Sequence, residues 1–184
     1  NDAFEVRAYA LPAESPLHPD NTLHERTLIS EPTGDTDFLA GWFLEYPFGE
    51  MDFQYTTLGV NGYVWESNTY GTDFSEDCGA EAVCDFAVDF DQEPSTYLGA
   101  SEAQAFYTIN MCHDILYKVG FTEAAGNFQL VNFGRGGAEE LLQVQVQNPD
   151  DVNNADFATP PDGQNPKMNL YLGTLGSPRR ASSF

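Results

Sequence analysis

One stretch of the chain has the spacing of an amphipathic helix. Between residues 99 and 119, apolar side chains recur every three or four positions, and they are Ala105, Ile109, Cys112, Leu116 and Val119. Ser101, followed three residues later by Gln104, has the spacing of a capping box, and Gly120 is a typical helix stop. We therefore expect a helix over 99–119 with this apolar face buried, so that Leu116→Ala costs roughly 2–5 kcal/mol of stability.

Shorter segments have the apolar patterns of strands. Leucine and valine alternate with glutamine across 141–146, which is typical of a strand with one buried face. Weaker patterns predict further strands, at 4–9, 86–90, 128–133 and 168–172, and short aromatic-rich strands and turns within 38–70.

Together these elements predict an α+β fold. We expect a mainly antiparallel, twisted sheet with one long helix packed across it. Residues 1–36 are rich in Pro, Glu, Thr and His, and we interpret them as an extended N-terminal arm laid over a body formed by 37–184.

The strongly negative net charge argues against anionic binding partners. The 184 residues include 29 acids against 7 Lys and Arg, which gives a formal charge of −22. Phosphate backbones and anionic membrane surfaces would be repelled, so we expect neither nucleic-acid nor membrane binding. Solubility in an acidic medium explains the charge better than a basic partner or a metal does. No long apolar run is present, and the chain begins without Met, so we expect a processed, secreted product.

The cysteines predict one small disulfide. Cys78 and Cys84 lie six positions apart in a Gly- and acid-rich stretch, which suits a surface bridge formed in an oxidising compartment. Cys112 is left over inside the helical pattern. We expect it to be a small buried side chain rather than an intermolecular bridge.

The histidines and one acidic cluster are further candidates for catalytic or metal sites, but each has a simpler explanation. The three histidines lack metal-ligand spacing and suggest no catalytic triad; they are His18, His24 and His113. An acidic cluster lacks the order of a calcium loop and is expected to be a solvated face; it contains Asp85, Asp89, Asp91 and Glu93.

Two longer segments are distinctive enough to indicate a family. One is FYTINMCHDILYKVGF at 106–121, followed by AGNFQ at 125–129, and the other is NNADFATPPDGQNPKM at 153–168. Both resemble the part of the fungalysins that lies just ahead of their zinc-binding helix. The resemblance covers about 57–184 well and the N-terminal arm loosely.

The resemblance implies a fold and a site. Fungalysins are secreted fungal zinc endopeptidases with a thermolysin-like catalytic domain, so this chain would form its N-terminal lobe. In that family the Asn-Ala-x-Phe segment lies on an edge strand that holds the substrate. By similarity, Asn154, Ala155 and Phe157 would form this edge strand here, as a vestige if the chain is not catalytic.

The sequence departs from the family at the metal site. It contains no His-Glu-x-x-His, the motif with which the family binds zinc on a helix. We therefore expect no catalytic residue, metal ligand or cofactor on this chain. In thermolysin-like domains the zinc helix covers one face of the sheet, so we also expect apolar surface to be exposed here and to need a partner.

Two functions fit these expectations. The chain is similar to the small subunits of heterodimeric fungal laccases, which implies a non-catalytic secreted subunit that stabilises a large subunit carrying all the copper. Alternatively, it is the N-terminal fragment of a fungalysin, cut at Arg179–Arg180 or nearby, with zinc on the missing part. A free-standing peptide-binding or inhibitory module is a third possibility.

Overall fold

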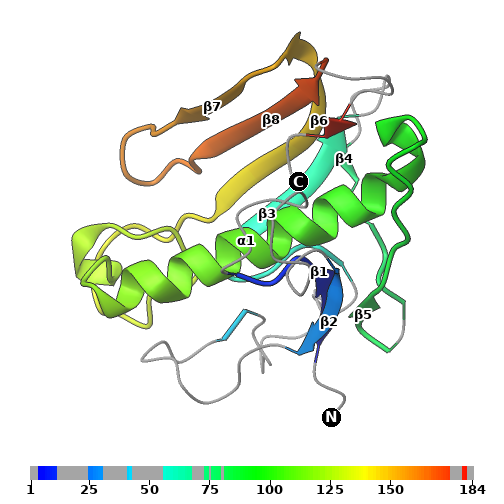
Figure 1. The fold of residues 1–184 in the computed structure, drawn as a ribbon. Helices are drawn as coiled ribbons and strands as arrows, with labels where there is room; N and C mark the ends of the chain where they lie inside the picture. The colour runs from blue at the N-terminus through cyan, green and yellow to red at the C-terminus, as the bar shows by residue number, and fades with distance from the viewer. Residues whose placement is uncertain are drawn as a thin grey trace.

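The described part of the chain folds as one long helix between two sheets (Figure 1). The computed structural model describes residues 4–11, 25–30, 41–42, 56–67, 73–74, 76–79, 81–174 and 180–181. The helices of the described residues are the 3₁₀ turn η3 (Pro94–Tyr97), α1 (Leu98–Lys118) and the 3₁₀ turn η4 (Glu123–Ala125). The strands are β1 (Glu5–Ala8), β2 (Thr27–Ser30), β3 (Gly62–Ser67), β4 (Asp73–Phe74), β5 (Val83–Cys84), β6 (Leu142–Val152), β7 (Ala155–Ala158), β8 (Lys167–Gly173) and β9 (Arg180–Ala181).

The large sheet has the strand order β4-β3-β6-β8-β7, with β9 also paired to β8. Its two central pairings, β3 with β6 and β6 with β8, are parallel, and its outer pairings are antiparallel. Among the described strands, four of the seven pairings in the two sheets are antiparallel. The predicted α+β class with one long helix is therefore confirmed, and the sheets are mixed.

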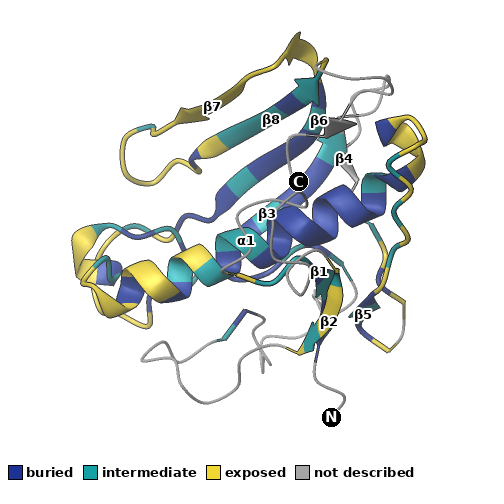
Figure 2. Cartoon of the chain, viewed as in Figure 1, coloured by how far each residue is buried: buried dark blue, intermediate teal, exposed yellow. Residues whose placement is uncertain are grey.

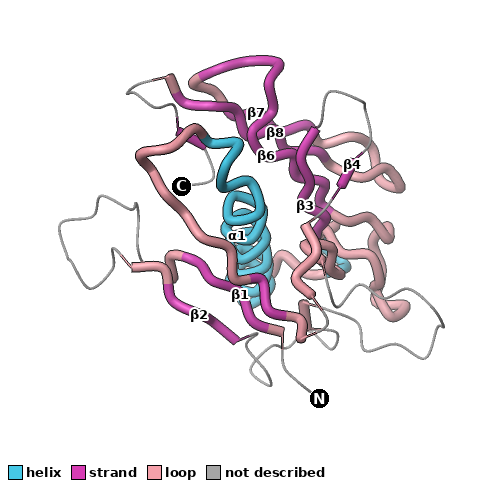
Figure 3. Tube along the Cα trace, turned by 90° about the vertical axis from the view of Figure 1, so that its right-hand side faces the viewer, coloured by secondary structure: helices cyan, strands magenta, loops and turns pink. Residues whose placement is uncertain are grey.

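The core forms where α1 meets both sheets. Figure 3 shows α1 almost end-on, with β1 and β2 on one side and the large sheet on the other. Phe106 is fully buried, and its ring makes edge contacts with Phe4 at 5.6 Å and with Trp42 at 6.3 Å. Gly62 lets β3 approach the helix, because a Cβ there would lie 2.2 Å from the Ile109 Cδ1.

The burial of α1 changes along its length (Figure 2). Every residue from 99 to 107 is buried, because both sheets cover this half. In the second half only Asn110, Asp114 and Tyr117 are buried, whereas Leu116 is 45% and Val119 is 77% exposed. The helix itself is confirmed, but the predicted buried face is wrong beyond its first turns. Of the apolar stripe identified from the sequence, Cys112 and Leu116 line a groove, whereas Val119 is exposed and does not line it.

The sequence predicted the C-terminal end of α1 correctly but not its N-terminal end. The predicted capping box is wrong, because η3 precedes α1 and the Ser101 hydroxyl donates to the Tyr97 carbonyl inside the helix at 3.3 Å. The predicted stop is confirmed: Gly120 has φ of +107°, and the N–H of Phe121 bonds back to the Leu116 carbonyl at 2.9 Å.

The strand predictions have mixed outcomes. Those at 4–9, 141–146 and 168–172 correspond to β1, β6 and β8 and are confirmed. The segment 86–90 is not a strand. Its backbone joins neither sheet, and its apolar side chains pack on Tyr97. The segment 128–133 makes a single bridge, between Gln129 and Glu140, and then turns.

The structure describes only part of the predicted N-terminal arm. Its strand β1 inserts Val6 and Ala8, both fully buried, into the core beneath α1. His18, His24 and Arg179, together with much of 38–70, lie outside the described residues. The domain boundary near residue 36 stays a prediction. No helix in the described part of the chain is long and apolar enough to cross a membrane.

Candidate functional site

The strand β7 forms an exposed edge of the large sheet. Among the described strands it pairs only with β8, and all four of its residues are exposed. The Tyr171 N–H donates to the Asn154 carbonyl at 3.2 Å. Because pairing alternates along an antiparallel strand, the main-chain groups of Ala155 and Phe157 point away from β8. An extended peptide could therefore pair with this edge as a further strand.

The Asn154 side chain is held on both of its polar atoms. Its Nδ2 donates to the Asp151 carboxylate at 3.0 Å, and its Oδ1 accepts from the Ala155 N–H at 2.9 Å. The hydrogen bond from Asn154 lowers the pKa of Asp151. The Ala155 N–H is thus already engaged. The Ala155 carbonyl and both main-chain groups of Phe157 remain directed toward a peptide at this edge.

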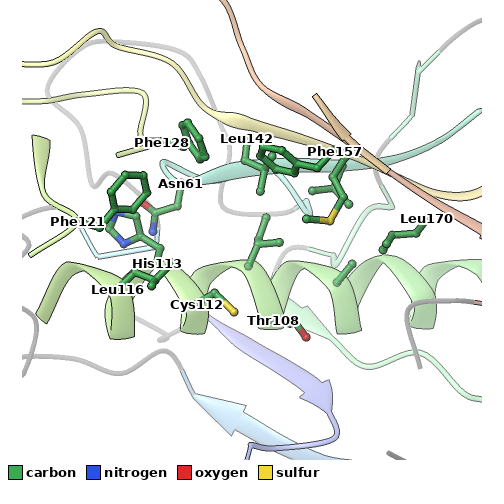
Figure 4. Close-up of a pocket in the computed structure, with 14 residues that line it drawn as sticks. Asn61, Thr108, Cys112, His113, Leu116, Phe121, Phe128, Leu142, Phe157 and Leu170 are labelled. Atoms are coloured by element: carbon green, nitrogen blue, oxygen red, sulfur yellow. The ribbon is translucent and has the colours of Figure 1, made fainter. Parts of the chain in front are cut away.

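An apolar groove of about 370 Å³ lies beside this edge, between the second half of α1 and the sheet (Figure 4). The helix contributes Ala105, Thr108, Ile109, Cys112, His113 and Leu116, and other segments contribute Asn61, Phe121, Phe128, Leu142, Val144, Phe157, Met168 and Leu170. Cys112 is outside any disulfide and is exposed here, so the prediction that it is buried is wrong. Partial burial raises the pKa of its thiol.

A row of aromatic rings joins the groove to the edge strand. The rings of Phe121 and Phe128 are 5.7 Å apart, and those of Phe128 and Phe157 are 6.0 Å apart. Phe157 therefore belongs to both features, since its backbone lies on the edge and its side chain lines the groove. Figure 4 shows Phe128 and Phe157 above the helix, facing Leu116 and Cys112.

The residues present do not fit a zinc site. In the ranges that the structure describes, no group of three His, Cys, Asp or Glu side chains could hold a metal. The ring of His113 instead lies between Asp114 Oδ1 at 3.3 Å and Gln129 Oε1 at 3.1 Å. Asp114 also accepts a hydrogen bond from Trp42 Nε1 at 3.0 Å. These contacts give His113 a structural role where α1 meets the loop that follows it.

Two other predicted features have clear positions. The disulfide between Cys78 and Cys84 is confirmed, but both cysteines are buried in the core and Cys84 belongs to β5, so the predicted surface position is wrong. Within the acidic cluster, Asp85 binds the Arg7 guanidinium through two oxygens, and this hydrogen bonding lowers its pKa. The other three acids of the cluster are exposed.

Several site residues were not identified from the sequence. Asp151 orients Asn154, and Phe121 and Phe128 extend the groove. Phe121 and Phe128 both lie within the first distinctive segment, 106–121 with 125–129, but their contact with the edge strand depends on tertiary structure. No periodic pattern could have indicated it.

Comparison with known proteins places this geometry in a family. A model of the family described as Fungalysin metallopeptidase (M36) matches residues 7–184. An extracellular metalloproteinase of Aspergillus flavus is 37% identical over 90% of this chain, and one of Leptosphaeria maculans is 36% identical over 100%. One of Pyricularia oryzae is 52% identical over 50% of this chain. The chain spans only 26%, 30% and 14% of these relatives, respectively. This chain therefore belongs to the fungalysin metallopeptidase (M36) family.

Proposed function

We propose that this chain is the N-terminal lobe of the catalytic domain of a secreted, fungalysin-type zinc endopeptidase. In this proposal β7 binds the peptide substrate in an extended conformation. The Ala155 carbonyl and both main-chain groups of Phe157 pair with the peptide, and the Asn154 side chain adds a polar contact at the end of the strand. The observation that carries the proposal is the position of this exposed edge directly beside an open apolar groove.

The groove is proposed to receive a later segment of the same catalytic domain. The relatives are much longer than the region that this chain matches, since it spans 26% and 30% of the first two. An apolar surface of this kind needs cover, and an amphipathic helix fits a groove with a helix on one side and a sheet on the other. The zinc ligands are proposed to lie in that later segment, because the residues described here do not fit a metal site.

Secretion is part of the same proposal. The relatives are named extracellular metalloproteinases. The disulfide between Cys78 and Cys84 is chemically consistent with an oxidising compartment. The strongly acidic composition suits a protein that must stay soluble outside the cell.

A matched pair of substitutions tests the groove. Leu116 lines it, whereas Val119 is 77% exposed, lies one helical turn further along and does not line it. In the full-length secreted protein, we expect Leu116→Arg to abolish most hydrolysis of casein, because a buried charge would displace the covering segment. Val119→Arg should retain activity within about twofold, as a surface change of the same chemistry should.

The activities of the two variants and of the wild type test different parts of the proposal. Equal activity of the two variants would contradict the proposed cover of the groove. A wild-type protein without chelator-sensitive endopeptidase activity would contradict the proposed function itself.

A non-catalytic accessory subunit is the second candidate. The same open groove favours it, because a separate secreted protein could also cover that surface. The partner predicted from the sequence is the large subunit of a heterodimeric laccase, which would carry all the copper. The metalloproteinase relatives favour the first candidate, and copper in a purified complex would favour the second.

A further inference from the structure

The exposed strand β7 has few apolar contacts to hold it. Only Phe157 among its residues packs into the groove, yet all four residues pair in register with β8. A shift of one residue would exchange the groups that face β8 with those that face a peptide. Something other than burial must therefore fix this register.

Asp156 supplies a polar anchor on the opposite face of the sheet from the groove. Its Oδ1 accepts a hydrogen bond from Asn169 Nδ2 at 2.7 Å, and its Oδ2 accepts one from the Tyr171 hydroxyl. Both donors lie on β8, and Tyr171 is buried. A carboxylate suits this position because it offers acceptors to two converging donors.

The anchor continues into the centre of the sheet. Asn169 Oδ1 accepts from Asn148 Nδ2 at 3.2 Å, and the same Asn148 nitrogen donates to Gln145 Oε1 at 3.0 Å. Asn148 and Gln145 are both buried on β6. A continuous line of side-chain hydrogen bonds thus connects exposed β7 to a buried strand.

The turn before β7 is fixed separately. Asn153 Oδ1 accepts from the Thr174 N–H at 2.7 Å, and Asn153 Nδ2 donates to the Thr174 hydroxyl at 2.6 Å. Asn153 has φ of +54°, a conformation that Asn tolerates better than most residues. The turn sets where β7 begins, and Asp156 sets the register of the strand itself.

We propose that Asp156 is a positioning residue for peptide binding at β7. It acts by holding the strand so that the main-chain groups of Ala155 and Phe157 face outward. This inference rests on the proposed function for its substrate, but the anchoring of β7 can be measured without any substrate.

The test uses the full-length secreted protein and three variants. Asp156→Ala removes both acceptors. Asp156→Asn removes the charge but keeps the ability to bond to Asn169 and to the Tyr171 hydroxyl. Asp162→Ala removes a similar exposed charge from the neighbouring 161–164 turn and is the control for electrostatic effects.

Amide hydrogen exchange reports on the strand. We expect Asp156→Ala to speed exchange of the backbone amides at positions 156 and 158 by about tenfold or more. The exchange rates of the α1 amides should not change. In peptide hydrolysis, KM should rise about tenfold with kcat changed less than twofold, because the chemistry lies elsewhere. Asp156→Asn should restore both readouts to within about threefold, and Asp162→Ala should match wild type.

Each outcome has a definite meaning. Unchanged exchange in Asp156→Ala would overturn the inference, whether or not the protein is a peptidase. Faster exchange with an unchanged KM would show that β7 does not position the peptide, which also overturns it. A wild-type protein that cleaves no peptide would instead contradict the proposed function, and the exchange data would still decide whether Asp156 anchors β7.

Discussion

Glu102 is a fully buried carboxyl in the first half of α1. Its Oε2 accepts hydrogen bonds from the Thr57 hydroxyl at 3.0 Å and from the Glu76 N–H at 2.7 Å. Its Oε1 has no hydrogen-bond partner among the described residues. Burial raises the pKa of Glu102 to about 8, against the opposing effect of these hydrogen bonds, and the nearby carboxylates of Glu76 and Glu66 raise it further. The side chain is therefore protonated in the folded protein at neutral pH.

The raised pKa makes stability depend on pH in a defined direction. The carboxyl is protonated in both states below the unfolded pKa of 4.5, so it imposes no ionisation penalty there. Above that pH the unfolded chain releases the proton while the folded chain keeps it, so stability falls until the pH passes the folded value of about 8. At about 1.4 kcal/mol per pKa unit, the loss between pH 4.5 and pH 7 is roughly 3 kcal/mol.

Glu102→Gln removes this dependence because the amide does not ionise. The variant leaves a buried amide group without a partner, so its absolute stability can be lower by about 1–3 kcal/mol. The informative quantity is the difference between variant and wild type as a function of pH, because the other carboxylates titrate in both proteins. We expect this difference to move by roughly 3 kcal/mol in favour of the variant from pH 4.5 to pH 7.

The assay is urea denaturation at several pH values and constant ionic strength. Glu81→Gln is the control, because it makes the same chemical change at an exposed position. A Glu102→Gln difference that stays constant within about 0.5 kcal/mol across this range would refute the reasoning, since Glu102 would then ionise like an exposed carboxyl.

Three further predictions concern stability and use chemical denaturation. Phe106→Ala should lower the free energy of unfolding by about 3–5 kcal/mol, because the Phe106 ring is fully buried. Leu116→Ala should lower it by only about 1 kcal/mol in this chain alone, because Leu116 is half-exposed. Equal losses in the two variants would contradict the described burial. Replacing Cys78 and Cys84 with Ser should cost about 2 kcal/mol, as expected for closure of a short loop, and no loss would show that the bridge does not constrain the unfolded chain. Asp85→Asn should cost less than about 1 kcal/mol, because its ion pair is partly exposed; its contribution is present above the unfolded pKa and is lost as the pH falls through the lowered folded pKa.

The regular elements were largely predictable from local pattern. The helix, its Gly120 stop, and the strands β1, β6 and β8 follow from periodicity and turn chemistry, which are local properties. The parallel pairing of β3 with β6 was not predictable. It joins segments about 80 residues apart through Val64 and Val144, and no local signal specifies such a pairing.

The face of α1 shows a second limit of sequence patterns. Apolar periodicity identified Cys112 and Leu116 correctly as one stripe, but it could not tell a packed face from an open groove. The buried stripe instead includes Asn110 and Asp114, whose polarity hides it from a search for apolar residues. Buried polar groups that bond to each other are visible only once their partners are known.

The candidate site was predictable only in part. The edge strand with Asn154, Ala155 and Phe157 came from resemblance to the fungalysins, and the structure places Ala155 and Phe157 on β7 and Asn154 directly before it. Their contact with substrate stays a prediction. The anchor at Asp156 depends on Asn169 and Tyr171 across the sheet, so the sequence alone gave no indication of it.

Native mass spectrometry with metal analysis, on the protein as purified from its source, tests the central claim most directly. We expect this sequence to be found in, or bound to, a polypeptide that carries one zinc ion and cleaves peptides in a chelator-sensitive manner. A complex with a copper-bearing partner of oxidase size, without zinc, would contradict the account and would establish the accessory-subunit function instead.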